Sequence, residues 1–527
     1  MTISRTDLPV VVDRSAAAPL ATQVAEQFRA AVEAGLLGAG ERLPSTRDLS
    51  TVLGVSRTVV TTAYARLFAE GWLEGRHGSG TYVADVAPIA PVVPIAPMAP
   101  ITSNAQSTHS SRAERAIDRT QPGSNAQSAQ LGLDTARELI ELRPGVPWAA
   151  GIEPAVWRRA WRYAGTRLPS FWPDPHGLPE LRAELAAYLR RSRGLTVTPP
   201  HVLVTRGVSS GLALVAAALL RPGDKVGIEE PGYAAAREIL SRAGARVVPC
   251  RVDAHGVVPD ELPDDLRLLY TTPAHQYPLG GRLPVARRQA LVSWARATGA
   301  VVVEDDYDSE FRYDVGPLPA LYSMGPDVIV YLGTASKVLA PAFGVGWLVA
   351  APELTERLAR LRPALGEKLP EPAQHALIEL LTSGDLERHI RRMRLEYARR
   401  RAAIVEALTG ASGASAESGA PGAAGAGPGT FRLPGPADAA PGTFRLHGDT
   451  AGMHLVLELP ADQPADRLVE AAAARGVALF TMDRYYAGPP TLNALILGYG
   501  ATPLTQVRRA ARELRALLTP TSACGWW

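Results

Sequence analysis

The sequence predicts a chain of two folded units: an N-terminal winged helix-turn-helix of the α+β class and a larger C-terminal α/β unit with a mostly parallel sheet. The 527 residues are three to four times the ~150 of a typical domain. A Pro/Ala/Ser-rich linker over 86–133 separates the units, 1–85 and 134–527. After Asp174, strand-like runs alternate with amphipathic helices, as in an open α/β sheet. Gly, Ala, Pro and Ser dominate residues 410–449, which we interpret as an insertion.

Composition excludes several classes of protein. With 46% hydrophobic and 20% charged residues, disorder is not the overall state, and a net charge of +3 is too small to attract nucleic acid or membrane by itself. The two cysteines, Cys250 and Cys524, support neither a disulfide framework nor a metal cluster, so no metal is expected. The start has no signal-peptide pattern, and the weakly polar run 87–101 is broken by proline and shorter than a membrane span of ~20 residues. We expect a cytoplasmic protein that does not contact membranes.

The first unit shows the pattern of a helix-turn-helix. Hydrophobic residues at helical spacing predict a helix that ends near Gly35. Serine caps then predict two short helices over 46–53 and 57–70, with a turn at Gly54 between them. Two short helices joined by such a turn are typical of DNA-binding modules.

Two alternating runs follow, over 72–75 and 81–83, around the glycine-rich segment 76–80, and predict a hairpin or wing. The second helix would lie in the major groove, and the wing tip would approach the minor groove. The N-terminal residues of that helix that could reach phosphates or bases are Ser56, Arg57, Thr58 and Thr61. Residues 1–84 carry equal numbers of Arg and of acidic residues, so charge leaves a protein-interaction module open.

This unit resembles the GntR-type winged helix. The resemblance is carried by Gly40-Glu-Arg-Leu-Pro-Ser-Thr-Arg-Asp-Leu49, Leu53-Gly-Val-Ser-Arg57, Leu67-x-Ala-Glu-Gly71 and Gly78-Ser-Gly-Thr-Tyr-Val83. It implies that DNA is contacted by Arg47, Ser56, Arg57, Thr58 and the wing residues Gly78, Ser79 and Gly80. Ala21 departs from the family, which usually has an aromatic residue there, and we expect the change to affect packing.

Lysine is rare in this chain. The three lysines are Lys225, Lys337 and Lys368, so 52 of the 55 basic residues are arginine. A remaining lysine raises the question of whether an amine is required, because a guanidinium stays protonated and is a poor nucleophile. For Lys225 and Lys368 we expect no special role.

The second unit places reactive groups where several predicted strands end. A Gly/Ser turn, Gly207–Gly211, follows one strand and opens a helix, which suits a phosphate. Glu304–Asp308 and Gly333–Lys337 follow two others, and Glu230–Tyr233 offers an aromatic face. An amine, a carboxylate, a phenol, a stacking aromatic and a phosphate cup are the parts that pyridoxal phosphate (PLP) requires. Each part alone is common, but the set predicts a PLP site.

The second unit resembles the fold type I aminotransferases, and the whole chain resembles the MocR/GabR regulators that join a GntR-type winged helix to such a domain. The motifs are Asp174-Pro-His-Gly-Leu-Pro-Glu-Leu-Arg182, Pro273-Ala-His-Gln-Tyr-Pro278, Glu304-Asp-Asp-Tyr-Asp-Ser-Glu-Phe-Arg-Tyr313 and Gly333-Thr-Ala-Ser-Lys337. The resemblance makes Lys337 the lysine that forms an aldimine with PLP, Asp305 the partner of the ring nitrogen and Tyr307 a neighbour of the ring oxygen. It also implies that Tyr233 stacks on the ring, and that the phosphate is held by Ser209, Ser210, Thr334 and Ser336.

Three positions depart from the family. Gly344 stands where an arginine usually helps to hold the phosphate, and Ile496 where another binds a carboxylate. Ala235 replaces a residue that is basic in the GABA-responsive member. Loss of a bidentate carboxylate clamp argues against efficient transamination of α-amino acids.

We therefore expect a transcription regulator that binds an operator in double-stranded DNA and uses PLP to sense an effector. The effector would be an amine, an amino-acid-like compound or PLP itself, and an ordinary α-amino acid is not expected. Two alternatives remain open: an aminotransferase with an appended DNA-binding domain, and a PLP-free regulator that uses the domain as a dimerisation scaffold. The resemblance also implies a homodimer.

Overall fold

The computed structural model describes residues 10–16, 18–34, 36–76, 80–84, 139–314, 318–409 and 444–518. The predicted linker, 86–133, lies outside these residues. Of the predicted insertion, 410–449, residues 444–449 are described, and they include strand β12 (Arg445–His447).

The N-terminal unit is a winged helix, as predicted. Its elements are α1 (Leu20–Glu33), α2 (Thr46–Leu53), α3 (Arg57–Glu70), β1 (Leu73–Arg76) and β2 (Gly80–Val83). The Ser45 hydroxyl accepts a hydrogen bond from the backbone N–H of Asp48 at 3.2 Å and so caps α2. Gly54 ends α2 in the left-handed region, at φ +62°, which makes the tight turn into α3. Phe28 and Tyr64 pack edge to face in the core between α1 and α3.

The C-terminal unit contains an eight-stranded, mostly parallel sheet, as predicted. Its strands are β4 (Val202–Thr205), β5 (Lys225–Glu230), β6 (Arg246–Asp253), β7 (Gly256–Val257), β8 (Leu268–Thr271), β9 (Val301–Asp306), β10 (Ile329–Thr334) and β11 (Gly346–Val349). They lie in the order β4-β11-β10-β9-β8-β5-β6-β7. β11 runs antiparallel to both of its neighbours, and β7 runs antiparallel to β6. The other neighbouring strands are parallel, so their carboxyl ends meet at one edge.

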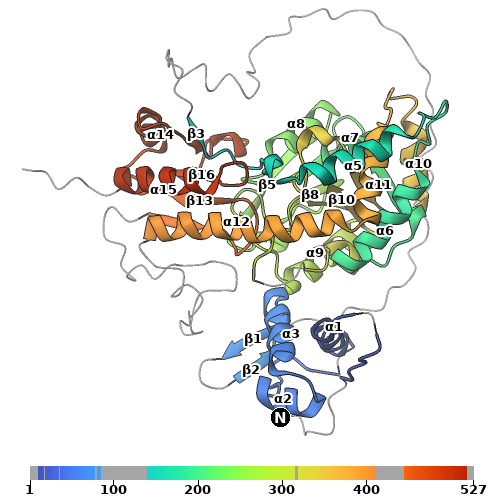
Figure 1. Ribbon diagram of the computed structural model, residues 1–527, viewed down its shortest axis with the longest axis horizontal. Helices are drawn as coiled ribbons and strands as arrows, with labels where there is room; N and C mark the ends of the chain where they lie inside the picture. Colours follow the sequence, from blue (N-terminus) through green and yellow to red (C-terminus); the bar gives the residue numbers. More distant parts are fainter. Residues whose placement is uncertain are drawn as a thin grey trace, which may run out of the picture.

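Helices cover both faces of this sheet (Figure 1). One face buries a cluster that includes Leu212, Leu240 and Leu358 under α7 (Val208–Leu219), α8 (Ala234–Arg242) and α10 (Pro352–Leu361). The larger core includes residues of α5 (Pro154–Gly165), α6 (Pro179–Arg193), α9 (Val285–Thr298), α11 (Glu371–Thr382) and α12 (Asp385–Thr409), and of the two C-terminal helices given below. The 3-10 turns are η1 (Ala149–Gly151), η2 (Pro199–His201), η3 (Pro259–Glu261), η4 (Leu321–Met324), η5 (Pro341–Phe343) and η6 (Asp483–Tyr485).

A smaller antiparallel sheet forms the C-terminal end of the molecule, reached along the 25-residue helix α12 (Figure 1). Its strand order is β12-β13-β16-β15, with β13 (His454–Glu458), β15 (Phe480–Thr481) and β16 (Ala494–Gly498). The helices α14 (Ala465–Ala474) and α15 (Leu504–Leu518) accompany it. A short parallel pair, β3 (Ile140–Glu141) and β14 (Val477–Ala478), ties the start of the unit to this sheet.

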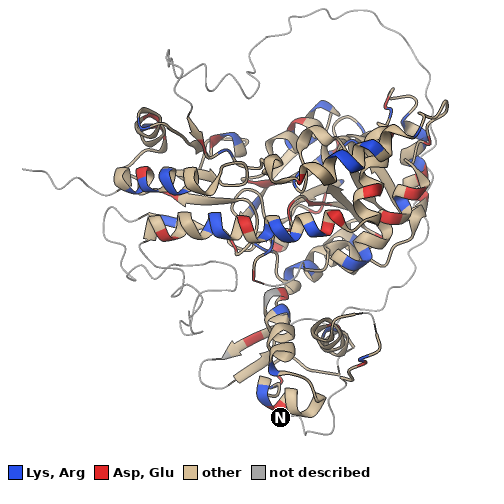
Figure 2. Cartoon of the chain, viewed as in Figure 1, with Lys and Arg blue, Asp and Glu red and all other residues tan. Residues whose placement is uncertain are grey.

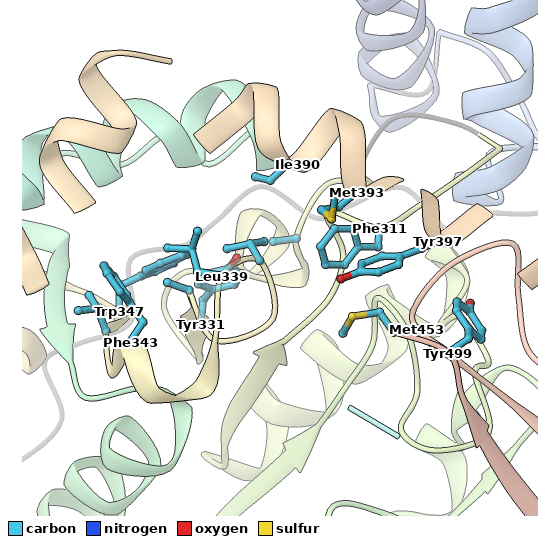
Figure 3. Close-up of a cluster of buried hydrophobic side chains, with 14 of the residues drawn as sticks. Phe311, Tyr331, Leu339, Phe343, Trp347, Ile390, Met393, Tyr397, Met453 and Tyr499 are labelled. Carbon is cyan, nitrogen blue, oxygen red and sulfur yellow. The ribbon is translucent and has the colours of Figure 1, made fainter. Parts of the chain in front are cut away.

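Aromatic and sulfur-containing side chains of α12 belong to the same buried cluster as Phe311 and Met453 (Figure 3). Tyr397 of α12 packs edge to face on Phe311, with ring centroids 4.9 Å apart. The Tyr397 hydroxyl accepts a hydrogen bond from the backbone N–H of Trp148 at 2.8 Å. This core therefore fixes the segment before α5, which also reaches Lys337 as described below.

Among the described residues, no helix has both the length and the hydropathy that crossing a bilayer requires.

Candidate functional site

Asp305 and Lys337 come from adjacent parallel strands and meet at the carboxyl edge of the large sheet. β9 carries Asp305, which lies in register with Leu332 of β10. Lys337 follows the end of β10 at Thr334. Because the strands are parallel, their ends deliver an acid and an amine to one place.

The Asp305 carboxylate is buried, and one of its two oxygens has a hydrogen-bond partner. Its Oδ2 accepts a hydrogen bond from the Tyr270 hydroxyl, while its Oδ1 has no hydrogen-bond partner among the described residues. Burial raises the pKa of Asp305 to about 7, although the Tyr270 hydrogen bond acts in the opposite direction. A buried carboxylate oxygen without a donor fits a ligand N–H, such as that of a pyridinium ring.

The Lys337 amine contacts the segment before α5. Its Nζ donates to the backbone carbonyl of Gly145 at 2.6 Å. Burial lowers the pKa of Lys337, and the nearby Asp308 and Asp305 oppose that shift. Gly145 adopts φ +74°, and a Cβ there would stand 3.2 Å from Nζ, so a glycine leaves room for the amine. A lowered pKa increases the fraction of neutral amine, which is the form that attacks a carbonyl group.

The Tyr307 hydroxyl belongs to a buried hydrogen-bond network. It lies 2.9 Å from Nδ1 of His275, which is also 3.0 Å from Oδ2 of Asp308. Burial raises the pKa of Tyr307 well above its usual value, so the phenol stays protonated. The Nε2 of His275 has no partner among the described residues. His454 packs beside His275 with ring centroids 5.2 Å apart.

His275, Asp308 and His454 are the group in the described structure whose spacing would suit a metal ion, with ligand atoms within 4.8 Å of one another. Hydrogen bonds within the protein explain why these three residues lie together without requiring a metal ion. His275 Nδ1 is shared between Asp308 and Tyr307, and His454 Nε2 lies 2.8 Å from the carbonyl oxygen of Pro278. Burial lowers the pKa of His454 to about 4, which keeps the ring neutral. We interpret the cluster as support for Tyr307.

A possible phosphate cup lies at the start of α7. Gly207 precedes the helix at φ +100°, and no side chain caps the helix N-terminus. The first N–H groups of a helix without a cap are available to an anion. A Cβ on Gly207 would stand 4.0 Å from Oγ1 of Thr334, and that hydroxyl donates to Ser336 at 2.9 Å. The turn after β4 and the turn after β10 therefore face each other.

Tyr233, Ser209 and Ser210 are the remaining predicted ligand residues. Burial raises the pKa of Tyr233. It packs edge to face on Tyr277 with ring centroids 6.0 Å apart. The Ser210 hydroxyl donates to the Glu367 carboxylate, so it already has a protein partner.

Two of the positions that depart from the family, 344 and 496, differ in their surroundings. A Cβ on Gly344, at φ +66°, would meet a single atom within 4 Å, the carbonyl oxygen of Ala342. Ile496 of β16 is fully buried in an apolar cluster with Phe480, Met482 and Tyr485. Position 496 is therefore part of the core, whereas position 344 has open space around it.

The predicted DNA-contacting side chains of the two helices are exposed. They are Arg47 on α2 and Ser56, Arg57, Thr58 and Thr61 at the start of α3. The wing residues Gly78 and Ser79 lie outside the described residues, while Gly80 opens β2 at φ +123°. Figure 2 shows acidic and basic residues interspersed over the large unit.

Arg42 was not among the predicted residues. A Cβ on Gly80 would lie 3.1 Å from Nε of Arg42, and the Arg42 side chain is exposed beside the wing. It belongs to the same motif that suggested Arg47, so the motif could have indicated it.

The sequence-based prediction also missed Tyr270, His275, His454 and Gly145. His275 lies inside the Pro273–Pro278 motif, which offered a signal. Tyr270 and His454 occupy buried strands, and Gly145 a turn, so their roles depend on contacts across more than thirty residues of chain.

Comparisons with known proteins agree with this arrangement. The family model "Bacterial regulatory proteins, gntR family" matches residues 20–83, and "Aminotransferase class I and II" matches residues 152–420. The HTH-type pyridoxine biosynthesis transcriptional regulator PdxR of Corynebacterium glutamicum is 36% identical over 96% of this chain and 98% of its own. The probable rhizopine catabolism regulatory protein MocR of Rhizobium meliloti is 31% identical over 98% and 97%.

Solved structures give the fold of the large unit. Kynurenine aminotransferase of Pyrococcus horikoshii superposes with a TM-score of 0.63 at 22% identity, over 76% of this chain and 95% of its own. LysN, the α-aminoadipate aminotransferase of Thermus thermophilus, gives a TM-score of 0.60 at 25% identity, over 75% and 96%. Both are aminotransferases, and the large unit shares their fold.

Proposed function

The chain belongs to the MocR-type HTH transcriptional regulators, in which a GntR domain is joined to an aminotransferase class I and II domain, and we propose that it binds PLP at Lys337 to sense its effector. The observation that carries the proposal is the pairing of a half-buried amine with a buried carboxylate at the carboxyl edge of the large sheet. Lys337 supplies an amine at one side, and Asp305 supplies a carboxylate oxygen without a protein donor at the other. In a chain with three lysines, an amine in this position is most simply explained by covalent binding of a carbonyl compound.

The residues present fit PLP. Asp305 would accept from the ring nitrogen, and Tyr307, oriented by His275, would donate to the ring oxygen. The α7 N-terminus with Ser209, Thr334 and Ser336 would hold the phosphate, with Ser210 beside them, and Tyr233 would cover the ring. When bound, PLP supplies an electrophilic carbon that exchanges the Lys337 amine for the amine of a ligand.

The effector that we propose is PLP itself or an amine. A relative that is 36% identical over nearly its whole length is named a regulator of pyridoxine biosynthesis, which supports PLP as a signal. The apolar surroundings of Ile496 provide no guanidinium at the usual position of the carboxylate clamp, which disfavours ordinary α-amino acids. A ligand can shift DNA binding only through different affinities for two states of the protein, so its effect must appear in a binding measurement.

For DNA, we propose that Arg47, Ser56, Arg57, Thr58 and Thr61 contact the operator from the helix-turn-helix. We propose that Gly78, Ser79 and Gly80 belong to the wing contact and that Arg42 supports it. Two winged helices in a homodimer would read paired half-sites.

The test begins with absorption spectra of the full chain mixed with PLP. Wild type and the control variants Lys225→Ala and Lys368→Ala should gain the visible band of PLP bound to an amine, and Lys337→Ala should not. Operator fragments, selected from random DNA by the wild-type protein, should bind Arg57→Ala at least about tenfold more weakly. The affinity of the wild-type protein for these DNA fragments should change when PLP is added. A band that persists in Lys337→Ala, or DNA affinity that is indifferent to PLP and to its amine ligands, would overturn the proposal.

A further inference from the structure

An arginine that the sequence motifs did not indicate lies beside a pair of tyrosines near Lys337. Arg484, in the turn η6, places its guanidinium carbon 5.6 Å from the ring centroid of Tyr485. The Arg484 side chain is exposed, and among the described residues no carboxylate forms an ion pair with it. A guanidinium beside an aromatic ring and without an acidic partner can accept an anionic ligand.

The backbone around Arg484 is held against the turn that carries Tyr233. The Arg484 carbonyl accepts a hydrogen bond from the Arg237 guanidinium at 3.1 Å, and the Tyr485 carbonyl accepts one from the N–H of Gly232 at 2.9 Å. The N–H of Ala487 donates to the Glu230 carboxylate at 2.6 Å. These three bonds fix the base of the Arg484 side chain, which reduces the entropy lost when it binds a ligand.

Two phenols connect Arg484 to the lysine. The hydroxyls of Tyr485 and Tyr277 are 3.2 Å apart, and one hydrogen bond between them uses one of their two protons. A Cβ on Gly145 would lie 3.9 Å from the Tyr277 hydroxyl and 3.2 Å from Nζ of Lys337. The amine, the two phenols and the guanidinium therefore follow one another in space.

The electrostatic field of Arg484 reaches these phenols. Burial is the main influence on Tyr233, Tyr277 and Tyr485 and raises their pKa values, and the charge of Arg484 acts in the opposite direction at all three. A charge that acts on three ring hydroxyls of the pocket also acts on a ligand that lies among them.

We propose that Arg484, with the hydroxyls of Tyr277 and Tyr485, binds the acidic group of an amine effector whose amino group lies at Lys337. The inference rests on the proposed function and narrows its ligand to an acidic amine. The acid cannot be recognised by a clamp at position 496, because Ile496 is packed in an apolar cluster. Arg484 stands beyond the Tyr277 and Tyr485 pair, so the acid must be separated from the amino group by a longer chain than in an α-amino acid.

The experiment uses full-length protein loaded with PLP and titrates it with glycine, β-alanine, 4-aminobutyrate, 5-aminovalerate and 6-aminohexanoate. Butylamine and pentylamine serve as acid-free partners, and the change in the visible band reports binding. In wild type, the longer amino acids should bind more tightly than glycine. Arg484→Gln should weaken their binding about 10- to 100-fold, as expected for loss of a charge-assisted hydrogen bond, and leave the alkylamines within about twofold. Arg484→Lys should retain part of the affinity.

Arg242→Gln is the matched control, because Arg242 is an exposed arginine whose partner is Glu238 on the surface of α8. It should bind every ligand as wild type does. Equal weakening of amino acids and alkylamines in Arg484→Gln, or no weakening of either, would overturn the inference, as would tightest binding of glycine. In these cases the PLP band of the unliganded protein persists and the proposed function stands. A wild-type protein that shows no PLP band would overturn the proposed function and, with it, this inference.

Discussion

A Cβ placed on Gly71, at the C-terminal end of α3, would lie 3.4 Å from the backbone nitrogen of Val285, the first residue of α9 in the aminotransferase domain. Gly71 ends α3 at φ +85°, and the lack of a side chain allows the two domains to approach closely. Val285 is 3% exposed and packs in the hydrophobic cluster of the winged helix. The large domain thus contributes a residue to the core of the small one.

This contact predicts that Val285→Asp separates the domains. An unpaired carboxylate in an apolar contact costs several kcal/mol, and the chain can avoid that cost by releasing the winged helix. Hydrogen exchange of residues 57–76 should therefore become faster while the large domain keeps its protection. Ala286→Asp introduces the same charge at the exposed neighbouring position and should leave exchange unchanged. Equal protection of 57–76 in the two variants would show that Val285 does not hold the domains together.

The raised pKa of Asp305 predicts how stability depends on pH in cofactor-free protein. Its pKa is about 7 in the folded chain against 3.8 for the ordinary group, so between these values the folded state holds a proton that the unfolded state has released. The stability contributed by this group is complete below about pH 4 and is lost as the pH rises through about 7. Asp305→Asn does not titrate. The free energy of unfolding of Asp305→Asn minus that of wild type should therefore increase by about 2–3 kcal/mol between pH 5 and pH 8, because only the wild type loses this stability.

Urea unfolding at the two pH values measures this difference. Asp265→Asn is the control, because the hydrogen bond from Lys225 lowers the pKa of this exposed carboxyl and it does not titrate in the interval. A difference between Asp305→Asn and wild type that stays constant with pH would mean that the buried carboxyl is already ionised at pH 5.

Local sequence patterns were enough to predict the winged helix and the parallel sheet. Serines and glycines at the helix ends predicted α2 and α3, although the Ser56 hydroxyl makes no capping hydrogen bond in the described structure. Acidic and Ser-Lys motifs near the strand ends placed Asp305 and Lys337 at one edge. Their partners came from distant segments: Tyr270 lies 35 residues from Asp305, and Gly145 lies 192 from Lys337. The backbone around Arg484 is held by hydrogen bonds to residues 230 and 237. Such contacts leave no local periodicity, so a single sequence does not reveal them.

Gly344 provides a test of the missing phosphate arginine. The position is open, since a Cβ would meet one atom within 4 Å, but φ +66° costs an L-residue about 1 kcal/mol. We expect Gly344→Arg to bind PLP about tenfold more tightly than Gly344→Ala, because both variants carry the backbone strain and one adds a guanidinium near the phosphate cup. Titration of the visible band gives both affinities. Equal affinities would place position 344 out of reach of the phosphate.

Ile496 should behave in the opposite way. Ile496 is fully buried with Val456, Phe480 and Met482, so a guanidinium there would lose its hydration without gaining an acidic partner. We expect Ile496→Arg to lower the free energy of unfolding by about 3 kcal/mol or more and to confer no binding of alanine on the PLP-loaded protein, whereas Ile496→Leu should cost less than about 1.5 kcal/mol. Thermal unfolding and spectral titration with alanine measure the two effects. Because Ile496 pairs across the sheet with Val456 and Phe480, restoring one arginine does not restore a clamp. A stable Ile496→Arg protein that binds alanine would show instead that this single residue excludes α-amino acids.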